Sequence, residues 1–187
     1  GLFSFKLIKS ERRIIAVRPL GDKVYDIECT IEVLSFLPEQ YTLDIYGKGQ
    51  YKDDYEKLIL SKGLSERIKI IDNFIDRNKM KKLFHKYDVF ISTTKLDTQG
   101  ITMLEAMSSG LLVAAINNSS KEEFISDMET GILANKPKEL AEKILKVTSS
   151  KELFERITKA GRESMEEIDV KLTCKKELRI LKEIASR

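Results

Sequence analysis

Short apolar segments alternate regularly with longer amphipathic ones along the sequence. The short segments are mostly apolar throughout, which is typical of parallel strands that are covered on both faces. Their order, strand then helix then strand, predicts an α/β fold with a Rossmann-like, doubly wound parallel sheet of about six strands. The expected strands are residues 13–17, 41–46, 67–71, 88–92, 111–115 and 130–134.

Helical spacing of apolar residues fills the intervals between these strands. The pattern is clear in 51–59 and again in 80–87, and Gly63 is typical of a helix C-cap. From about Lys138 onward the pattern is helical throughout, so a helical C-terminal tail is expected.

Composition indicates one soluble globular domain spanning residues 1–187. Hydrophobic residues make up 42% and charged residues 34% of the 187 residues, and there is no repeat or linker-like tract. The 33 basic residues are interleaved with 30 acidic ones, which does not favour nucleic acid as a partner. No apolar run approaches the roughly 20 residues of a membrane span, and no signal peptide is recognisable. We therefore expect a cytoplasmic protein, and the start at Gly1 suggests a piece of a longer chain.

The sequence predicts no metal site and no cofactor. Cys29 and Cys174 lie far apart, which is typical of free, unreactive thiols in a reducing compartment. His85 is the only histidine, and no nucleophile or acid lies next to it in the sequence. We interpret His85 as a structural or solvent-facing residue.

In doubly wound sheets, ligands bind outside the carboxyl ends of the strands. After the first expected strand, "VRPLGDK" places Arg18 and Lys23 on either side of Gly21, at a strand-to-helix junction. Two cations beside a helix N-terminus suit a diphosphate, Arg18 as a fork and Lys23 as a point charge. The alternative is a turn with two surface bases.

The loops after the second and third strands carry weaker signals. "YGKGQ" permits tight backbone turning, but neither G-x-G-x-x-G nor G-K-[ST] occurs, which disfavours a dehydrogenase or an NTPase. Asn73 and Phe74 follow the third strand and could hold a flat base, although Phe74 could equally be a core residue. The following helical segment, 77–87, is rich in Lys and Arg; it is either a solvated face or a contact with an anionic membrane surface.

The segment after the fourth strand, "KLDTQGITMLEAMSS", contains the largest number of candidate ligand-binding residues. Asp97 lies in the loop, and Glu105 lies about one turn inside the next helix. Gly100 allows the backbone to approach a ligand, and the N–H groups of Ile101 and Thr102 open the helix toward it. Because an unpaired buried carboxylate is costly, Glu105 needs a partner, either ligand hydroxyls or a base such as Arg18.

These residues resemble a known family. "GITMLEAMSSGLLVAA", with an acid eight residues before Glu105, resembles the E-x7-E signature of retaining glycosyltransferases of the GT-B fold, family 4. "VRPLGDK", "YGKG", "NFI" and "DMETGILA" resemble four further motifs of that family, in the same order, from about residue 13 to residue 165. The chain is similar to the C-terminal, nucleotide-sugar-binding half of these enzymes.

The resemblance implies a role for each matching position. Asp97 and Glu105 would be the catalytic pair, with Glu105 on the ribose hydroxyls and Asp97, Thr98 and Gln99 on the sugar. The donor diphosphate would be bound by Arg18, Lys23 and the main chain of Gly100, Ile101 and Thr102, and the base by Asn73 and Phe74. The family generally needs no divalent ion.

The implied activity is transfer of a hexose from a UDP- or GDP-sugar to a glycan, lipid or protein acceptor that is bound by an N-terminal domain. Family members usually have Glu at the position of Asp97 and Gly-Phe-Gly at 98–100, so the choice of sugar is expected to differ here. Two alternatives share the architecture: a nucleotide-sugar-binding module without catalysis, and an epimerase or phosphorylase.

Overall fold

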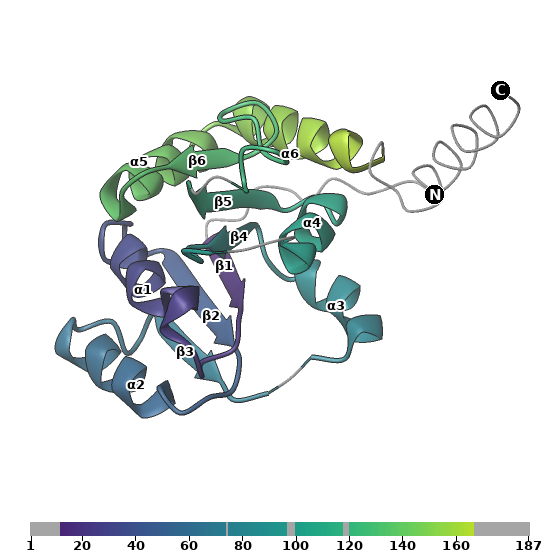
Figure 1. Ribbon diagram of the computed structural model, residues 1–187. Coiled ribbons are helices and arrows are strands. Elements are labelled where there is room, and N and C mark those ends of the chain that lie inside the picture. Colours follow the sequence, from purple (N-terminus) through teal and green to yellow (C-terminus); the bar gives the residue numbers. More distant parts are fainter. Residues whose placement is uncertain (1–11, 74, 97–99, 118–119, 167–187) are drawn as a thin grey trace, which may run out of the picture.

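A computed structural model describes residues 12–73, 75–96, 100–117 and 120–166. Six strands form one sheet in the order β3-β2-β1-β4-β5-β6, and every neighbouring pair is parallel (Figure 1). The predicted fold class is therefore confirmed. The strands are β1 (Arg12–Val17), β2 (Tyr41–Tyr46), β3 (Ile68–Ile71), β4 (Val89–Ser92), β5 (Leu112–Ile116) and β6 (Ile132–Ala134).

Helices cover both faces of this sheet (Figure 1). On one face α1 packs against α2 and α5, and on the other α4 packs against α3 and α6. The predicted helical tail is present as α5 and α6, whereas residues 167–187 lie outside the described part of the chain. The helical elements are η1 (Lys23–Tyr25), α1 (Ile27–Ser35), α2 (Lys52–Ser61), α3 (Arg77–Phe84), α4 (Ile101–Ser108), α5 (Pro137–Thr148) and α6 (Lys151–Glu166).

The apolar strand pattern reflects burial on both sides of the sheet. Ile14 and Ile15 are neighbours in β1, are 1% and 0% exposed, and belong to two different core clusters. Successive side chains of a strand point to opposite faces, so a central strand with both faces covered must be apolar at every position. This is why the sequence pattern was informative for β1, β4 and β5.

The last strand is shorter than expected. The sequence predicted 130–134, but β6 begins at Ile132. The preceding residues form a turn instead: Met128 adopts a left-handed conformation (φ 61°), and the Thr130 N–H donates to the Ser126 carbonyl. Only the last three residues of the predicted strand therefore reach the sheet.

The expectation of an unreactive thiol agrees with the surroundings of Cys29. Cys29 lies half-buried in α1 and is a free cysteine. Burial, and then the nearby Asp26 carboxylate, raise the pKa of its thiol to about 12. The thiolate, which is the reactive form, is therefore scarce near neutral pH. Cys174 lies outside the described residues.

Among the helices that the structure describes, none combines the length and the apolar character needed to cross a bilayer. His85, which ends α3, is exposed to solvent, as expected from its sequence context.

Candidate functional site

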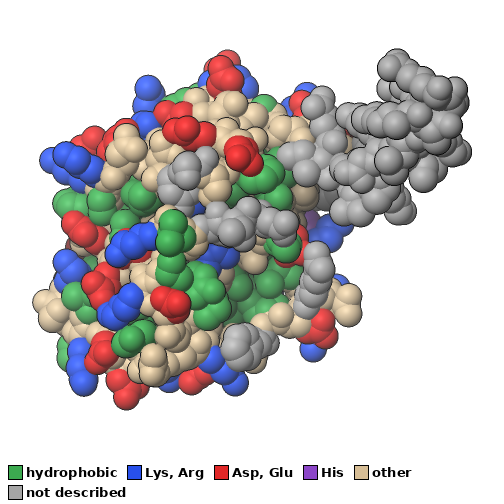
Figure 2. Space-filling view, viewed as in Figure 1, with side chains coloured by type: hydrophobic (Ala, Val, Ile, Leu, Met, Phe, Trp, Pro, Cys, Tyr) green, Lys and Arg blue, Asp and Glu red, His purple; other side chains and the backbone are tan. Residues whose placement is uncertain are grey.

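A cavity of about 310 Å³ opens at the carboxyl edge of the sheet. Its walls come from the loops after β1, β2 and β3, from α3, and from the start of α4. Hydrophobic side chains gather in the middle of the face seen in Figure 2, with charged side chains around them. The lining residues are Val17, Arg18, Pro19, Tyr25, Tyr46, Gly47, Asn73, Ile75, Met80, Gly100, Ile101 and Thr102.

This position is the one at which parallel sheets of this kind bind ligands. The strand order reverses direction at β1, with β2 on one side and β4 on the other. The loops after β1 and β4 therefore diverge and leave a crevice between them. Five residues predicted for the site line this crevice: Arg18, Asn73, Gly100, Ile101 and Thr102.

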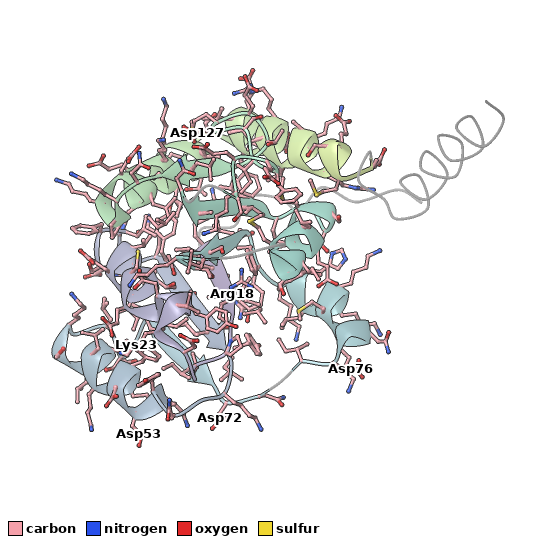
Figure 3. The ribbon with its side chains drawn as sticks, viewed as in Figure 1. Arg18, Lys23, Asp53, Asp72, Asp76 and Asp127 are labelled. Carbon is pink, nitrogen blue, oxygen red and sulfur yellow. The ribbon has the colours of Figure 1, made fainter. Side chains whose placement is uncertain are left out.

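Arg18 is the one cation among the described residues that line the cavity, and it is 9% exposed. Its Nε donates to Thr94 Oγ1 at 3.0 Å, and its Nη2 donates to Ser92 Oγ at 3.1 Å. Figure 3 shows Arg18 near the middle of the molecule, beside β1. These two bonds orient the guanidinium through the hydroxyls of Ser92 and Thr94.

The end of β4 forms the other half of this arrangement. Ser92, Thr93 and Thr94 are all at most 3% exposed. Thr93 Oγ1 lies 2.8 Å from the Asp26 carbonyl oxygen and 2.7 Å from Thr30 Oγ1. Sequence reasoning missed this Ser-Thr-Thr segment, because hydroxyl residues after a strand are common and their partners are remote in the sequence.

Lys23 does not line the cavity. Its Nζ pairs with Glu28 Oε1 at 2.5 Å and lies 4.7 Å and 5.0 Å from the ring centroids of Tyr51 and Tyr55. The hydrogen bond to Glu28 raises the pKa of Lys23. Figure 3 shows Lys23 on the side of α2, away from Arg18. The structure therefore separates the two cations that the sequence had grouped together.

The start of α4 lies at the cavity. Gly100 is left-handed (φ 51°, ψ 32°) and its carbonyl accepts from the N–H groups of Met103 and Leu104. The N–H groups of Ile101 and Thr102 belong to the first turn, which has no intrahelical acceptor, and both residues line the cavity. Glu105 is half-buried one turn further along α4 and is not among the described residues that line the cavity.

The glycines of "YGKG" allow two loops to touch. A Cβ at Gly47 would lie 1.9 Å from the Arg18 carbonyl oxygen, and a Cβ at Gly49 would lie 2.0 Å from the Leu20 carbonyl carbon. The Leu20 N–H donates to the Lys48 carbonyl at 2.8 Å, so the loop after β1 lies directly on the loop after β2. These glycines are needed for the contact that places Arg18, and not only for a turn.

Four predicted site residues lie outside the described part of the chain: Phe74, Asp97, Thr98 and Gln99. In the part that is described, no three His, Cys, Asp or Glu side chains gather in a group that could hold a metal ion.

One buried residue was missed entirely. Lys121 follows β5, is 1% exposed, and its Nζ donates to the main-chain carbonyls of Ser92, Thr94 and Ile116. In the sequence Lys121 stands in the polar stretch "SSKEE", which is typical of a surface loop. No local signal distinguishes it from a solvated lysine.

Comparison with known proteins supports a single family. The chain is 27% identical over 147 residues to alpha-monoglucosyldiacylglycerol synthase of Acholeplasma laidlawii. This match covers 79% of this chain and 36% of the relative. The chain spans between 24% and 36% of the length of the first three curated relatives that it matches.

Solved structures show the same fold. The C-terminal domain of the group 1 glycosyl transferase LpcC from Francisella tularensis superposes with a TM-score of 0.73 at 21% identity, over 82% of this chain and 84% of that one. The Anabaena protein HepE, in complex with UDP and glucose, superposes with a TM-score of 0.79 at 20% identity, over 95% of this chain and 49% of that one.

The family match covers most of the sequence. Residues 3–164 match the family described as "Glycosyl transferases group 1". This range includes all the strands that the structure describes and all the described residues that line the cavity. The chain therefore belongs to the group 1 glycosyl transferases.

Proposed function

We propose that the chain is one nucleotide-sugar-binding domain that holds a UDP- or GDP-sugar for transfer of its hexose to an acceptor. The observation that carries this proposal is the pairing of a pre-oriented guanidinium, Arg18, with the opening turn of α4 across one cavity. A cation and the N–H groups of a helix N-terminus beside one cavity are what a diphosphate requires.

The proposed chemistry depends on charge that develops during the reaction. As the bond between the sugar and the distal phosphate breaks, the leaving nucleoside diphosphate gains negative charge. Arg18 and the N–H groups of Ile101 and Thr102 would stabilise that charge more strongly in the transition state than in the bound donor. These groups would suffice without a metal ion, and we propose none.

Further residues are proposed to bind the base, the ribose and the sugar. Asn73 lines the cavity and, together with Phe74, would hold the base. Glu105 would bind the ribose hydroxyls, and Asp97, Thr98 and Gln99 would bind the sugar. The binding of UDP and glucose by HepE, a protein of the same fold, supports UDP as the first nucleotide to test.

The direct test is calorimetric titration of the chain with UDP, GDP and ADP, repeated with Glu105→Ala. We expect one nucleotide to bind, and we expect Glu105→Ala to weaken it about tenfold, because the loss of a charged hydrogen-bond acceptor costs about 1.4 kcal/mol or more. Glu142→Ala, at an exposed position of α5, is the matched control and should bind as the wild type does. Equal affinities for Glu105→Ala and wild type would rule out the ribose assignment, and no binding of any nucleotide would overturn the proposed function.

Lys23 provides a second prediction. Its family-based role on the diphosphate requires it to leave Glu28, so the ion pair with Glu28 competes with the donor. We expect Glu28→Gln to strengthen UDP binding about two- to fivefold and to leave the thermal midpoint nearly unchanged, since both partners are about half exposed. In a Lys23→Met background the same change should have no effect on affinity. A gain that persists without Lys23 would contradict this role.

The proposal extends to the acceptor and the stereochemistry. We propose transfer with retention of anomeric configuration, in polysaccharide or related glycoconjugate synthesis, with a glycan, lipid or protein acceptor bound by a second domain. The chain's span of 36% of the Acholeplasma relative supports the need for that second domain. Residues 1–187 alone should bind donor and transfer nothing; sugar transfer by this chain alone would refute the proposal.

We also propose a cytoplasmic location with peripheral contact at the inner face of the membrane. The support is the exposed basic surface of α3 and the residues that follow it, where Lys79, Lys81, Lys82 and Lys86 are all exposed. Lysines grouped in this way are attracted to anionic headgroups. Co-sedimentation with phosphatidylglycerol vesicles checks this; equal recovery with phosphatidylcholine vesicles would argue against it.

A further inference from the structure

Lys121 is almost completely buried, although lysine is rarely so. Its side chain is 1% exposed, and Nζ lies 3.2 Å, 2.9 Å and 2.9 Å from the carbonyl oxygens of Ser92, Thr94 and Ile116. The three protons of an ammonium group match these three acceptors. Burying a charge is costly unless it is hydrogen-bonded in this way, so the position of Lys121 is closely defined.

The acceptors of Lys121 lie at the carboxyl ends of two neighbouring strands. The ladder between β4 and β5 ends at the pair Ser92 and Ala115. Thr94 and Ile116 both lie beyond that last pair, and their carbonyls are joined through Lys121. Lys121 thus extends the connection between β4 and β5 past the last residue pair of their ladder.

Lys121 and Arg18 bind the same two residues from different sides. Arg18 donates to the side-chain hydroxyls of Ser92 and Thr94, and Lys121 donates to the main-chain carbonyls of these residues. The direction of each hydroxyl depends on the orientation of its own backbone. If the carbonyls lost Lys121, the hydroxyls that orient the Arg18 guanidinium would no longer be held in place.

We propose that Lys121 is a positioning residue that acts through Ser92 and Thr94 to aim Arg18 at the donor diphosphate. This inference rests on the proposed function of the cavity, and it assigns a role in donor recognition to a residue that cannot reach the ligand. Lys121 touches no reacting atom; it sets the geometry of the residue that does.

The test is a double-mutant cycle on the whole chain, with UDP as the probe. We expect Lys121→Met to weaken UDP binding about tenfold and Arg18→Ala to weaken it about 100-fold. Because Lys121 acts through Arg18, the double variant should bind no more weakly than Arg18→Ala alone. Additive losses, giving about a 1000-fold effect in the double variant, would overturn the proposal.

The matched control is Lys143→Met. Lys143 Nζ also donates to the carbonyl of a strand residue, Leu133 in β6, and pairs with Asp127 and Glu139, but it lies away from the cavity. Both lysine variants are expected to lower the thermal midpoint, and only Lys121→Met should change UDP affinity. Equal effects of the two variants on affinity would show that the loss reflects general stability and would overturn the proposal.

A readout without ligand separates this inference from the proposed function. The Arg18 Nε–H donates to a buried hydroxyl, so its proton should exchange slowly with water in the wild type and faster in Lys121→Met, as measured by NMR. Lys121→Gln keeps an N–H donor for some of the three carbonyls that Lys121 binds, so its exchange rate should lie between those of the wild type and Lys121→Met. If exchange is unchanged, or if both Lys121 variants fail to fold, Lys121 is a stability residue and the proposal fails. If exchange changes as expected and the wild type binds no nucleoside diphosphate, the proposed function fails instead.

Discussion

Replacing Arg18 with alanine is expected to weaken UDP binding about 100-fold. The substitution removes the cation of the cavity and also the donor for the buried hydroxyls of Ser92 and Thr94. Loss of a charge-assisted contact to a diphosphate costs about 2.8 kcal/mol, which corresponds to about 100-fold at about 1.4 kcal/mol for each tenfold change. Calorimetric titration with UDP measures it.

Arg67→Ala is the matched control for Arg18→Ala. Arg67 immediately precedes β3, and its guanidinium donates to the carbonyls of Leu34, Leu37, Pro38 and Tyr41. Because Tyr41 begins β2, this cluster lies at the amino edge of the sheet, opposite the cavity. Arg67→Ala should lower the free energy of unfolding by about 2 kcal/mol and leave UDP affinity unchanged. If the two variants weakened UDP binding equally, Arg18 would have no special role in the site.

Gly47→Ala is expected to destabilise the fold and to abolish measurable UDP binding. The added Cβ would lie 1.9 Å from the Arg18 carbonyl oxygen and 3.0 Å from its carbonyl carbon. Both are backbone atoms, so the loop after β1 would have to move as a whole. We expect a loss of about 3 kcal/mol, equivalent to a decrease of about 6–12 °C in thermal midpoint, as seen by calorimetry or circular dichroism.

Gly21→Ala is the control for Gly47→Ala, because Gly21 lies in the same pair of loops. A Cβ at Gly21 would meet only the Gly49 Cα, at 3.9 Å, which is an ordinary contact. Its thermal midpoint and UDP affinity should stay close to those of the wild type. A Gly47→Ala protein as stable as Gly21→Ala would show that the loop after β1 does not depend on contact with the loop after β2.

The strands were predictable because their signal is local. Because β1 is covered on both faces, its neighbouring residues Ile14 and Ile15 are both buried and both apolar. The apolar run in 13–17 was therefore a direct sign of a buried strand. The end of the sheet was less clear. Thr130 and Gly131 stand directly before the apolar residues 132–134, but they belong to the turn that follows the left-handed Met128, so β6 begins only at Ile132.

The site was only partly predictable. Gly100 and the start of α4 were recognisable because a glycine before an apolar helix marks a helix N-terminus that a ligand can approach. Arg18 was recognisable from its place after a strand. Lys23 had the same local signal, yet it lies against Tyr51, Tyr55 and Glu28. Local sequence places a residue in a loop, but the direction of a long side chain depends on neighbours that come from other elements.

The parallel α/β sheet, the edge of the sheet that carries the cavity and the family were all predictable from the sequence, because strand burial, turn residues and short motifs are properties of consecutive residues. The sequence did not reveal which cation faces the cavity, or that Arg18 and Lys121 bind the same two residues of β4 and its loop. Residues 18, 92 and 121 are far apart in the chain, and hydrogen bonds between them leave no trace in the pattern around any one of them. The physical reason is that hydrogen-bond partners are selected by distance in space, which the order of residues alone does not specify.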